Sequence, residues 1–279
     1  MEKDFSIIMS TFNAAATLPE CLASIRSQDS RECEVLVVDG GSTDGTQQIL
    51  RDNQDLFAHL IMEPDKGIYD AWNKVIDKCN GEWILFLGAD DQLKDHSVLS
   101  NLKKEVSRNA TPQTMYCYGQ VDLVDGNSVI DRFGEDSFPN QKKRILKPRP
   151  FSHTGLLHHH SLFTKFGKFD ATYRIAGDSE FLIRTLKHAE VEVLKMDLDV
   201  AIMGHGGIST SVDSRLVAYL EDMRALRTHG HIIPPWHILS KASRAALAYY
   251  ISQIFGPKFA LTVCNSYRKL VGKNQRNKI

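Results

Sequence analysis

Short apolar runs that each end in polar residues recur through the first third of the chain, and they constrain its fold most. These runs cover residues 5–9, 34–38 and 83–89, and each has the length of a buried strand. Helical patterns cover residues 17–27, 43–53 and 65–79. Strands that alternate with helices are typical of βαβ units. The sequence therefore predicts an α/β fold with a doubly wound sheet flanked by helices.

Two adjacent carboxylates, Asp90 and Asp91, follow the third apolar run. Open α/β sheets bind ligands beyond the carboxyl ends of their strands, which is where these two acids would lie. Carboxylates that are brought together repel and lose hydration, so the pair favours a bound cation. Mg²⁺ and Mn²⁺ take oxygen ligands and suit such a site. A solvated turn would also account for the pair, because Asp is common in turns.

The chain resembles family 2 glycosyltransferases of the GT-A fold, of the kind that act in bacterial polysaccharide synthesis. Residues 5–91 carry this resemblance in the segments SIIMSTFNAAATLPECLASI, EVLVVDGGSTDGT and PDKGIYDAWNKVIDKCNGEWILFLGADD. A weaker match, FGKFDATYRIAGDSEFLIRTL, extends it to about Leu186. The resemblance implies a mixed GT-A sheet. It also implies an inverting enzyme that moves a sugar from a nucleotide-sugar to a hydroxyl of a glycan or lipid-linked acceptor.

The resemblance also implies roles for residues of the donor side. Asp39 would bind the nucleotide base, with Thr11 and Asn13 alongside it and Lys66 near the base or a phosphate. Uracil has an N–H that can donate a hydrogen bond to a carboxylate, so we expect a UDP-sugar. Asp91 would hold Mn²⁺ or Mg²⁺ against the donor diphosphate, with Asp90 on the ribose or the metal, and His205 would be a further metal ligand.

On the acceptor side, the resemblance makes Asp178 the general base. Asp178 also stands where a helix N-cap is expected, before an apolar-periodic segment, and Glu180 is an alternative base. The sequence departs from the family twice. Gly88 replaces the first acid of a D-x-D-D motif, and Gly177 replaces the Glu that commonly precedes the base. These departures keep a non-catalytic sugar-nucleotide-binding protein open. A sugar-nucleotide-forming nucleotidyltransferase is the other alternative, but residues 10–16 contain neither the Gly nor the Arg of its usual phosphate loop.

Charge divides the chain unevenly although its formal net charge is zero. Residues 223–279 contain ten Lys or Arg and no Asp or Glu, whereas residues 1–222 contain 24 basic and 34 acidic side chains. We therefore predict a catalytic domain at 1–222 and a basic amphipathic helical tail at 223–279. The donor-binding half would cover about 1–91 and the acceptor-side half about 92–222. Such a tail could lie on an anionic membrane or pack on the catalytic domain. No nucleic-acid motif accompanies the charge, so we expect no nucleic-acid partner.

The expected location follows from the expected acceptor, a glycan or an isoprenoid-diphosphate-linked glycan. No signal peptide is expected, because the acidic start lacks a long apolar region, and no stretch approaches the ~20 apolar residues of a membrane span. Five scattered cysteines fit a reducing compartment. We therefore expect a cytoplasmic enzyme, peripheral on the inner face of the cytoplasmic membrane and held there in a salt-sensitive way.

Overall fold

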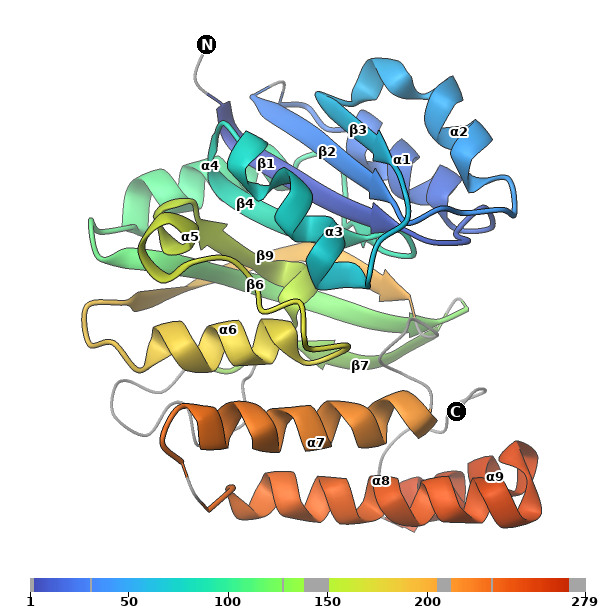
Figure 1. The fold of residues 1–279 in the computed structure, drawn as a ribbon. Helices are drawn as coiled ribbons and strands as arrows, with labels where there is room; N and C mark the ends of the chain where they lie inside the picture. The colour runs from blue at the N-terminus through green and yellow to red at the C-terminus, as the bar shows by residue number, and fades with distance from the viewer. Residues whose placement is uncertain are drawn as a thin grey trace.

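The structure is a computed structural model that describes residues 3–30, 32–126, 128–137, 151–204, 212–231 and 233–270. Within these ranges a nine-stranded mixed sheet forms the centre, helices cover both of its faces, and further helices form an outer layer (Figure 1). The N-terminal strands β3-β2-β1-β4 are parallel neighbours in that order, which is a doubly wound arrangement.

The N-terminal half alternates strands and helices as the apolar runs predict. Its elements are β1 (Lys3–Thr11), α1 (Leu18–Arg26), β2 (Cys33–Asp39), α2 (Thr46–Asp52), β3 (His59–Met62), α3 (Ile68–Val75) and β4 (Gly81–Gly88). Helix α2 begins three residues later than predicted, because the side chain of Asp44 accepts hydrogen bonds from the backbone N–H and the hydroxyl of Thr46. Short 3₁₀ helices cover Gln54–Leu56 and Ile76–Lys78.

The second half adds antiparallel strands to the same sheet. Its elements are β5 (Gln92–Leu93), α4 (Val98–Asn109), β6 (Thr114–Asp125), β7 (Ser128–Phe133), a 3₁₀ turn (His153–Gly155), β8 (Leu156–His159), α5 (Ser161–Phe166), α6 (Gly177–Leu186) and β9 (Glu192–Gly204). Strand β8 pairs antiparallel with β4 on one side and with β6 on the other. Strand β9 runs parallel to β6 and pairs antiparallel with β5.

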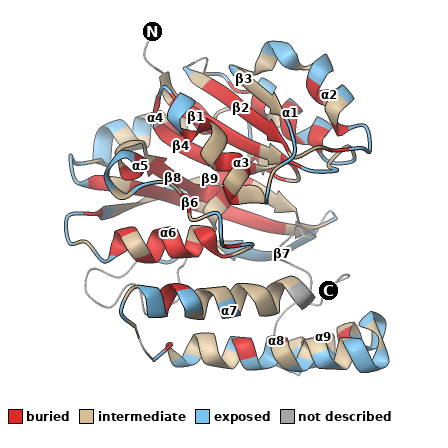
Figure 2. Cartoon of the chain, viewed as in Figure 1, coloured by how far each residue is buried: buried red, intermediate tan, exposed pale blue. Residues whose placement is uncertain are grey.

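Two hydrophobic cores lie on opposite faces of the sheet, because successive strand residues point to opposite sides. Ile8 and Phe86 belong to the core beneath α3, α5 and α6, whereas Ile7 and Leu87 belong to the core beneath α1 and α4. Figure 2 shows buried residues concentrated in the strands and the helices next to them. The carboxyl ends of β2, β1 and β4 therefore meet at one rigid edge.

The C-terminal helices α7 (Val212–Thr228), α8 (Trp236–Phe255) and α9 (Pro257–Leu270) form the outer layer. Helix α7 packs on α6, α8 packs on α7, and α9 packs on α8 (Figure 1). The predicted boundary between residues 222 and 223 falls within α7, so the division into domain and tail stays a prediction. Among the residues described, none of the helices combines the length and apolarity needed to cross a bilayer.

Candidate active site

Asp39 ends β2 and is fully buried within a network of donors from its own chain. Its Oδ1 accepts hydrogen bonds from Thr11 Oγ1 at 2.9 Å and Ser42 Oγ at 2.5 Å. Its Oδ2 accepts from the N–H groups of Gly41 at 3.1 Å and Ser42 at 2.9 Å, and from Gln47 Nε2 at 3.0 Å. Burial alone would raise the pKa of Asp39, but the hydrogen bonds from Ser42, Gln47 and Thr11 bring it below the usual value. Asp39 is therefore a buried anion.

The other predicted donor-side residues surround this network at the edge of the sheet. Asn13 is exposed, takes a positive φ of 50°, and ties the first loop to the second: its N–H donates to Ser42 Oγ, and its Oδ1 accepts from the N–H of Thr43. Thr11 is directly paired with Asp39 in the β1–β2 register. Lys66 is exposed just before α3, and its backbone N–H donates to Asp70.

The acidic pair lies at the same edge, immediately beyond β4, since Gly88 pairs with Ser10 next to Thr11. Asp91 is buried and accepts hydrogen bonds from Thr154 Oγ1 at 3.0 Å and from the N–H groups of Gly88 and Gly204 at 3.2 Å each. Donors from the end of β4, from residue 154 and from the end of β9 thus hold one carboxylate in place. The contribution of Thr154 has no local signal in the sequence, because it lies 63 residues from Asp91.

Gly88 leaves a small space into which both acids point. A Cβ atom added at Gly88 would lie 2.8 Å from Asp91 Oδ2 and 2.9 Å from Asp90 Oδ1. An aspartate at this position, as in a D-x-D-D motif, would collide with both carboxylates. The departure from the family pattern therefore keeps a space open between two carboxylate oxygens.

Burial disfavours the charged forms of both Asp90 and Asp91. Burial, followed by the neighbouring charge of Asp90, raises the pKa of Asp91 to about 7. Burial also raises the pKa of Asp90. Paired, poorly solvated acids of this kind favour a divalent cation with oxygen ligands, so the residues fit Mn²⁺ or Mg²⁺.

The described part of the chain offers few further ligands for such an ion. Across the described ranges, no group of three or more His, Cys, Asp or Glu side chains is placed to hold a metal. His205, the predicted third ligand, lies outside the described residues. Gly204, which precedes His205 in the sequence, donates its N–H to Asp91. An ion held by Asp90 and Asp91 would complete its coordination with substrate oxygens and water, as Mg²⁺ usually does.

Asp178 lies in the first turn of α6, whose N-cap is Ala176, so the alternative in which Asp178 is the N-cap is excluded. Its Oδ1 accepts a hydrogen bond of 3.1 Å from the hydroxyl of Tyr69, which also lies 2.5 Å from the carbonyl oxygen of Ile175. Tyr69 comes from α3, which follows β3, so it links the acceptor-side helix to the donor edge. No local pattern in the sequence predicts this contact, because the two residues are 109 positions apart.

Position 177, where the family motif commonly has Glu, has no room for a side chain in this structure. A Cβ atom added at Gly177 would lie 2.7 to 2.9 Å from three ring atoms of Tyr69. The aromatic ring thus occupies the space of a side chain at 177. Asp178 stays half-buried beside it, with one described donor to its carboxylate.

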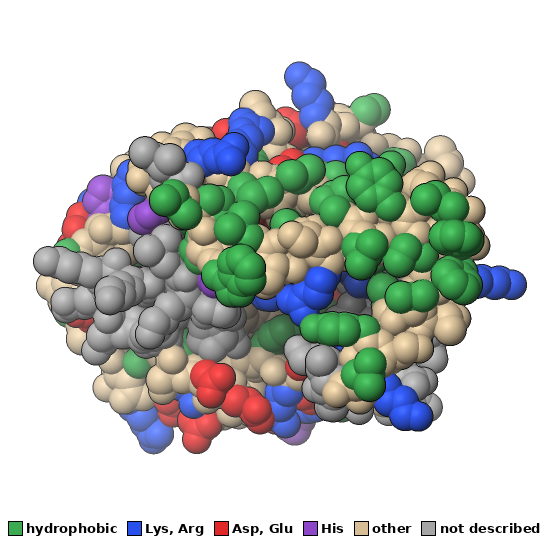
Figure 3. Space-filling model, turned by 90° about the horizontal axis from the view of Figure 1, so that it is seen from below, with side chains coloured by type: hydrophobic (Ala, Val, Ile, Leu, Met, Phe, Trp, Pro, Cys, Tyr) green, Lys and Arg blue, Asp and Glu red, His purple; other side chains and the backbone are tan. Residues whose placement is uncertain are grey.

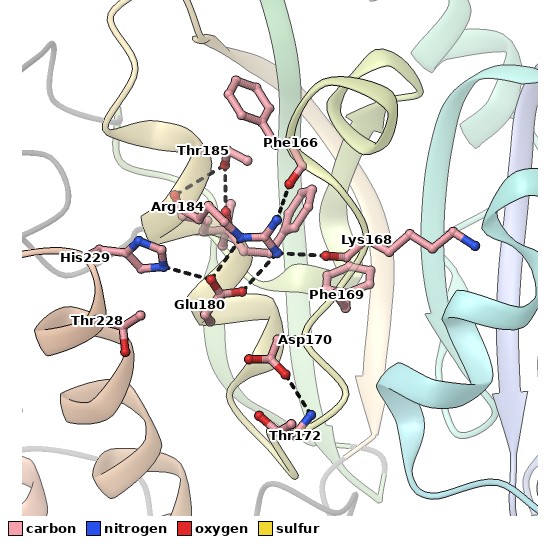
Figure 4. Close-up of polar contacts among 12 residues, drawn as sticks. Phe166, Lys168, Phe169, Asp170, Thr172, Glu180, Arg184, Thr185, Thr228 and His229 are labelled. Atoms are coloured by element: carbon pink, nitrogen blue, oxygen red, sulfur yellow. Dashed lines mark hydrogen bonds and ion pairs between the residues drawn. The ribbon is translucent and has the colours of Figure 1, made fainter.

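Glu180, the alternative base, is engaged in a structural ion pair (Figure 4). It is buried and accepts hydrogen bonds from Arg184 Nε at 2.9 Å and Nη2 at 3.0 Å, and its Oε1 lies 2.8 Å from His229 Nε2. Arg184 also donates to the carbonyl oxygens of Phe166 and Lys168. Both Glu180 oxygens are committed to this network, which ties α6 to α7 and to the loop after α5.

We expect Glu180→Ala to lower the free energy of unfolding by about 3–5 kcal/mol, because it leaves the partly buried Arg184 without its carboxylate. Urea denaturation followed by circular dichroism measures this. Glu190→Ala is the matched control. It breaks an exposed ion pair with Lys165 and should cost less than about 1 kcal/mol. Equal losses in the two variants would show that the Glu180 network adds nothing special.

Known proteins resemble this chain in sequence and in fold. A family model described as "Glycosyl transferase family 2" matches residues 6–170. A "PGL/p-HBAD biosynthesis glycosyltransferase" of Mycobacterium bovis is 34% identical over 216 residues, which are 75% of this chain and 80% of the relative. The E. coli enzyme "UDP-Glc:alpha-D-GlcNAc-diphosphoundecaprenol beta-1,3-glucosyltransferase WfgD" is 28% identical over 129 residues, 46% of this chain and 49% of that enzyme.

Among solved structures, S. aureus TarS in complex with UDP-GlcNAc superposes with a TM-score of 0.63 and 20% identity, over 89% of this chain and 72% of that chain. This likeness concerns the fold, and with the mixed sheet it confirms the predicted GT-A class. The doubly wound parallel strands, the carboxylate pair and the matched region all belong to one and the same part of the molecule, residues 6–170.

Proposed function

Because this chain belongs to glycosyl transferase family 2, we propose that it transfers a sugar from a UDP-sugar to a hydroxyl of a glycan or lipid-linked acceptor, with inversion at the sugar. The observation that carries the proposal is the convergence of Asp90 and Asp91 on the space above Gly88, at the sheet edge that also holds Asp39. That edge combines a buried anion, Asp39, that can bind the nucleotide base with an acidic pair that can hold a cation against the diphosphate.

A ligand screen tests the donor class directly. A ligand that binds the native state raises the melting temperature, so UDP-, GDP- and dTDP-sugars can be compared with Mn²⁺ present. We expect the largest rise with a UDP-sugar. The names of two similar proteins support this choice, since one is described as using UDP-Glc and the other was solved with UDP-GlcNAc. If Mn²⁺ alone raises the melting temperature and none of the nucleotide-sugars raises it further, the proposal is contradicted.

In the donor site, we propose that the base N–H reaches Asp39 by replacing Gln47. The other donors to Asp39 are backbone N–H groups or short hydroxyl side chains, whereas Gln47 is a longer, half-buried side chain that can swing away. Thr11 and Asn13 would then hold the loops around the base, and Lys66 would meet a phosphate or the base from the surface.

We expect Asp39→Ala to weaken UDP binding by roughly ten- to a hundred-fold, because a hydrogen bond to a charged group contributes about 1.5–3 kcal/mol. Isothermal titration calorimetry with Mn²⁺ measures the affinity, and circular dichroism checks the fold. Gln47→Ala is the matched control: it removes a donor to the same carboxylate and should leave UDP affinity equal or tighter. Unchanged affinity in Asp39→Ala would contradict the assignment.

For the metal, the family commonly uses divalent cations, and we propose that Asp91 holds Mn²⁺ or Mg²⁺ with Asp90 on the ion or on the ribose. When bound, such an ion offsets the negative charge that develops on the departing diphosphate. His205 is the proposed additional ligand. Thr154 and the N–H groups of Gly88 and Gly204 fix the orientation of the Asp91 carboxylate.

For the transfer step, we propose that Asp178 removes the proton of the acceptor hydroxyl as that oxygen attacks the anomeric carbon. A single displacement with one base inverts the configuration, whereas retention would need a nucleophilic carboxylate as well. Glu180 is the nearest other acid on α6, and its oxygens are committed to Arg184 and His229. The Tyr69 hydroxyl would hold Asp178 in position.

For the acceptor and the location, we propose a glycan carried on an isoprenoid diphosphate at the inner face of the cytoplasmic membrane. The name of the E. coli relative supports this class, because it includes a diphosphoundecaprenol-linked acceptor. An enzyme that joins a cytosolic donor to such a lipid has to reach the membrane surface. The positively charged residues of 223–279 suit that contact.

A further inference from the structure

Helix α8 exposes an apolar stripe on the side that faces away from α7. Trp236, Leu247, Tyr250 and Ile254 recur at spacings of 11, 3 and 4 residues, so they lie on one face of the helix. Their exposed fractions are 80%, 61%, 62% and 70%. The opposite face buries Ala242 and Ala245. This helix therefore buries its small residues and presents its large ones.

Helix α9 continues this apolar surface. Phe259, Val263 and Leu270 follow a helical spacing and are exposed, and Phe255 contacts Phe259 across the turn at Gly256. Viewed from below, hydrophobic side chains gather over a broad area with Lys and Arg side chains among them (Figure 3). We call the exposed apolar residues of α8 and α9 the apolar face. Contiguous exposed apolar surface of this kind marks an interaction site.

The charges beside the apolar face are all of one sign. Residues 236–270 contain five Lys or Arg and no Asp or Glu. Lys241, Lys258 and Lys269 are exposed. Arg244 instead packs over the ring of Tyr267, where it also donates a hydrogen bond of 2.8 Å. An apolar surface that includes Trp and Tyr, on two helices whose own charged side chains are all positive, suits the interface of an anionic membrane.

We infer that α8 and α9 lie flat on an anionic bilayer with the apolar face inserted among the lipids, so that the attachment is hydrophobic as well as electrostatic. This inference deepens the membrane contact of the proposed function and rests on the surface of the two helices, whatever sugar the enzyme transfers. The 20 residues of α8 span about 30 Å, enough to spread its stripe along the membrane plane. The sequence predicted a basic amphipathic tail with a salt-sensitive attachment, and the structure adds which of its apolar residues are exposed.

A second copy of the chain fits this face less well than a membrane does. In a symmetric dimer, the same surface of both subunits meets, which would bring the cations of one subunit close to those of the other. Neither helix carries an acid that could neutralise them. Interfaces between proteins are also depleted of Lys, whereas anionic lipid headgroups attract it.

Tryptophan fluorescence of the full-length protein distinguishes insertion from mere electrostatic contact. Trp236 is 80% exposed, whereas Trp72 and Trp83 are only 7% and 3% exposed. On vesicles that mix phosphatidylglycerol with phosphatidylcholine, we expect a blue shift of the emission and quenching by brominated acyl chains. Trp236→Phe should abolish both signals while flotation with the vesicles is kept. Flotation of the unaltered protein without a blue shift would overturn the insertion.

Two sets of substitutions separate the two contributions to binding. The apolar-face variant Leu247→Ser, Ile254→Ser, Leu270→Ser should lower vesicle affinity at least about a hundredfold, since three large side chains no longer leave water. The charge variant Lys241→Gln, Lys258→Gln, Lys269→Gln should lower it roughly a hundredfold in low salt and have little effect at about 1 M salt. All six positions are exposed, so both variants should fold.

Matched controls use exposed residues on other elements. Val129→Ser on β7 and the triple substitution Lys78→Gln, Lys104→Gln, Lys187→Gln should leave vesicle affinity unchanged. UDP affinity should be unchanged in every variant, which checks that each variant is folded. Failure of the unaltered protein to bind UDP would count against the proposed function and not against the membrane face. Sedimentation velocity tests the alternative. If the unaltered protein forms dimers without vesicles and the apolar-face variant is monomeric, the apolar face serves self-association and the inference is overturned.

Discussion

Replacing Asp91 with asparagine is expected to abolish metal-dependent transfer while the protein stays folded. Asparagine keeps the size of the side chain and can still accept from Thr154, but it removes the charge that would hold a cation. Loss of a metal ligand removes the charge stabilisation of the leaving diphosphate, so we expect turnover to fall by at least about a thousandfold. Release of UDP from the donor, followed with and without Mn²⁺, measures the change.

The same substitution should change how the stability of the metal-free protein depends on pH. This gives a measurement that does not depend on enzyme activity. The folded-state pKa of Asp91 is about 7, against about 3.9 for an exposed aspartate. The native state therefore binds this proton more tightly than the unfolded state, and stability falls as the pH rises from about 4 to about 7. In EDTA, the melting temperature of Asp91→Asn minus that of the unaltered protein should therefore rise over this range and then stay constant. The amide loses one hydrogen bond at every pH, because its NH₂ group faces the N–H of Gly204 when its oxygen accepts from Thr154.

Mn²⁺ should raise the melting temperature of the unaltered protein and leave that of Asp91→Asn unchanged. A proton and the cation compete for Asp91, so the rise in melting temperature caused by Mn²⁺ should grow as the pH approaches 7 and should be absent in Asp91→Asn. Thr154→Val is a companion variant that keeps the charge and removes one orienting hydrogen bond. It should weaken the metal effect without abolishing it. Near-normal, Mn²⁺-dependent turnover in Asp91→Asn would refute the metal assignment.

Replacing Asp178 with asparagine should remove transfer by a factor of about 10²–10⁴, the usual contribution of a positioned general base. Donor binding should stay intact, because the carboxylate would act on the acceptor hydroxyl only. Calorimetry with UDP measures the donor side, and product formation with a hydroxyl acceptor measures the transfer. The Tyr69 hydroxyl can still donate to the amide oxygen of asparagine, so the local structure should survive.

Two further variants make the choice of carboxylate decisive. Tyr69→Phe removes the donor to Asp178 but keeps the ring against Gly177, so it should lower transfer less than Asp178→Asn does and change its pH profile. Glu180→Gln should affect stability and leave transfer in the folded protein largely unchanged. If Asp178→Asn retains transfer and Glu180→Gln loses it, the base is Glu180.

Local patterns were enough to predict the donor half of the fold. Strands β1, β2 and β4 are nearly continuous apolar runs, and α1, α2 and α3 lie within the predicted helical stretches. Strand β3 was not predicted, because its four residues are all half-buried and show no contrast between faces. Strands β8 and β9 were not predicted either, since their partners in the sheet lie far away in the sequence.

In the candidate site, too, local patterns predict some features and tertiary contacts decide the others. The position of Asp39, Asp90 and Asp91 at one edge follows from strand order, which the βαβ pattern predicts. The groups that orient these acids depend on tertiary contacts. Gly204 is 113 residues from Asp91, and Tyr69 is 109 residues from Asp178, so no periodicity or motif connects them. The network of Asp39 is more local, yet its saturation by Gln47 and Ser42 depends on the exact path of one loop.

The contact between Tyr69 and Gly177 has a consequence for how this enzyme could evolve. The two positions form an epistatic pair, because any side chain added at 177 would collide with the Tyr69 ring. A lineage that regained an acidic residue at 177 would first have to accept a smaller residue at 69, and it would then lose the hydroxyl beside Asp178. The change at 69 would therefore have to come first, and the intermediate would carry Asp178, the proposed base, with neither neighbour.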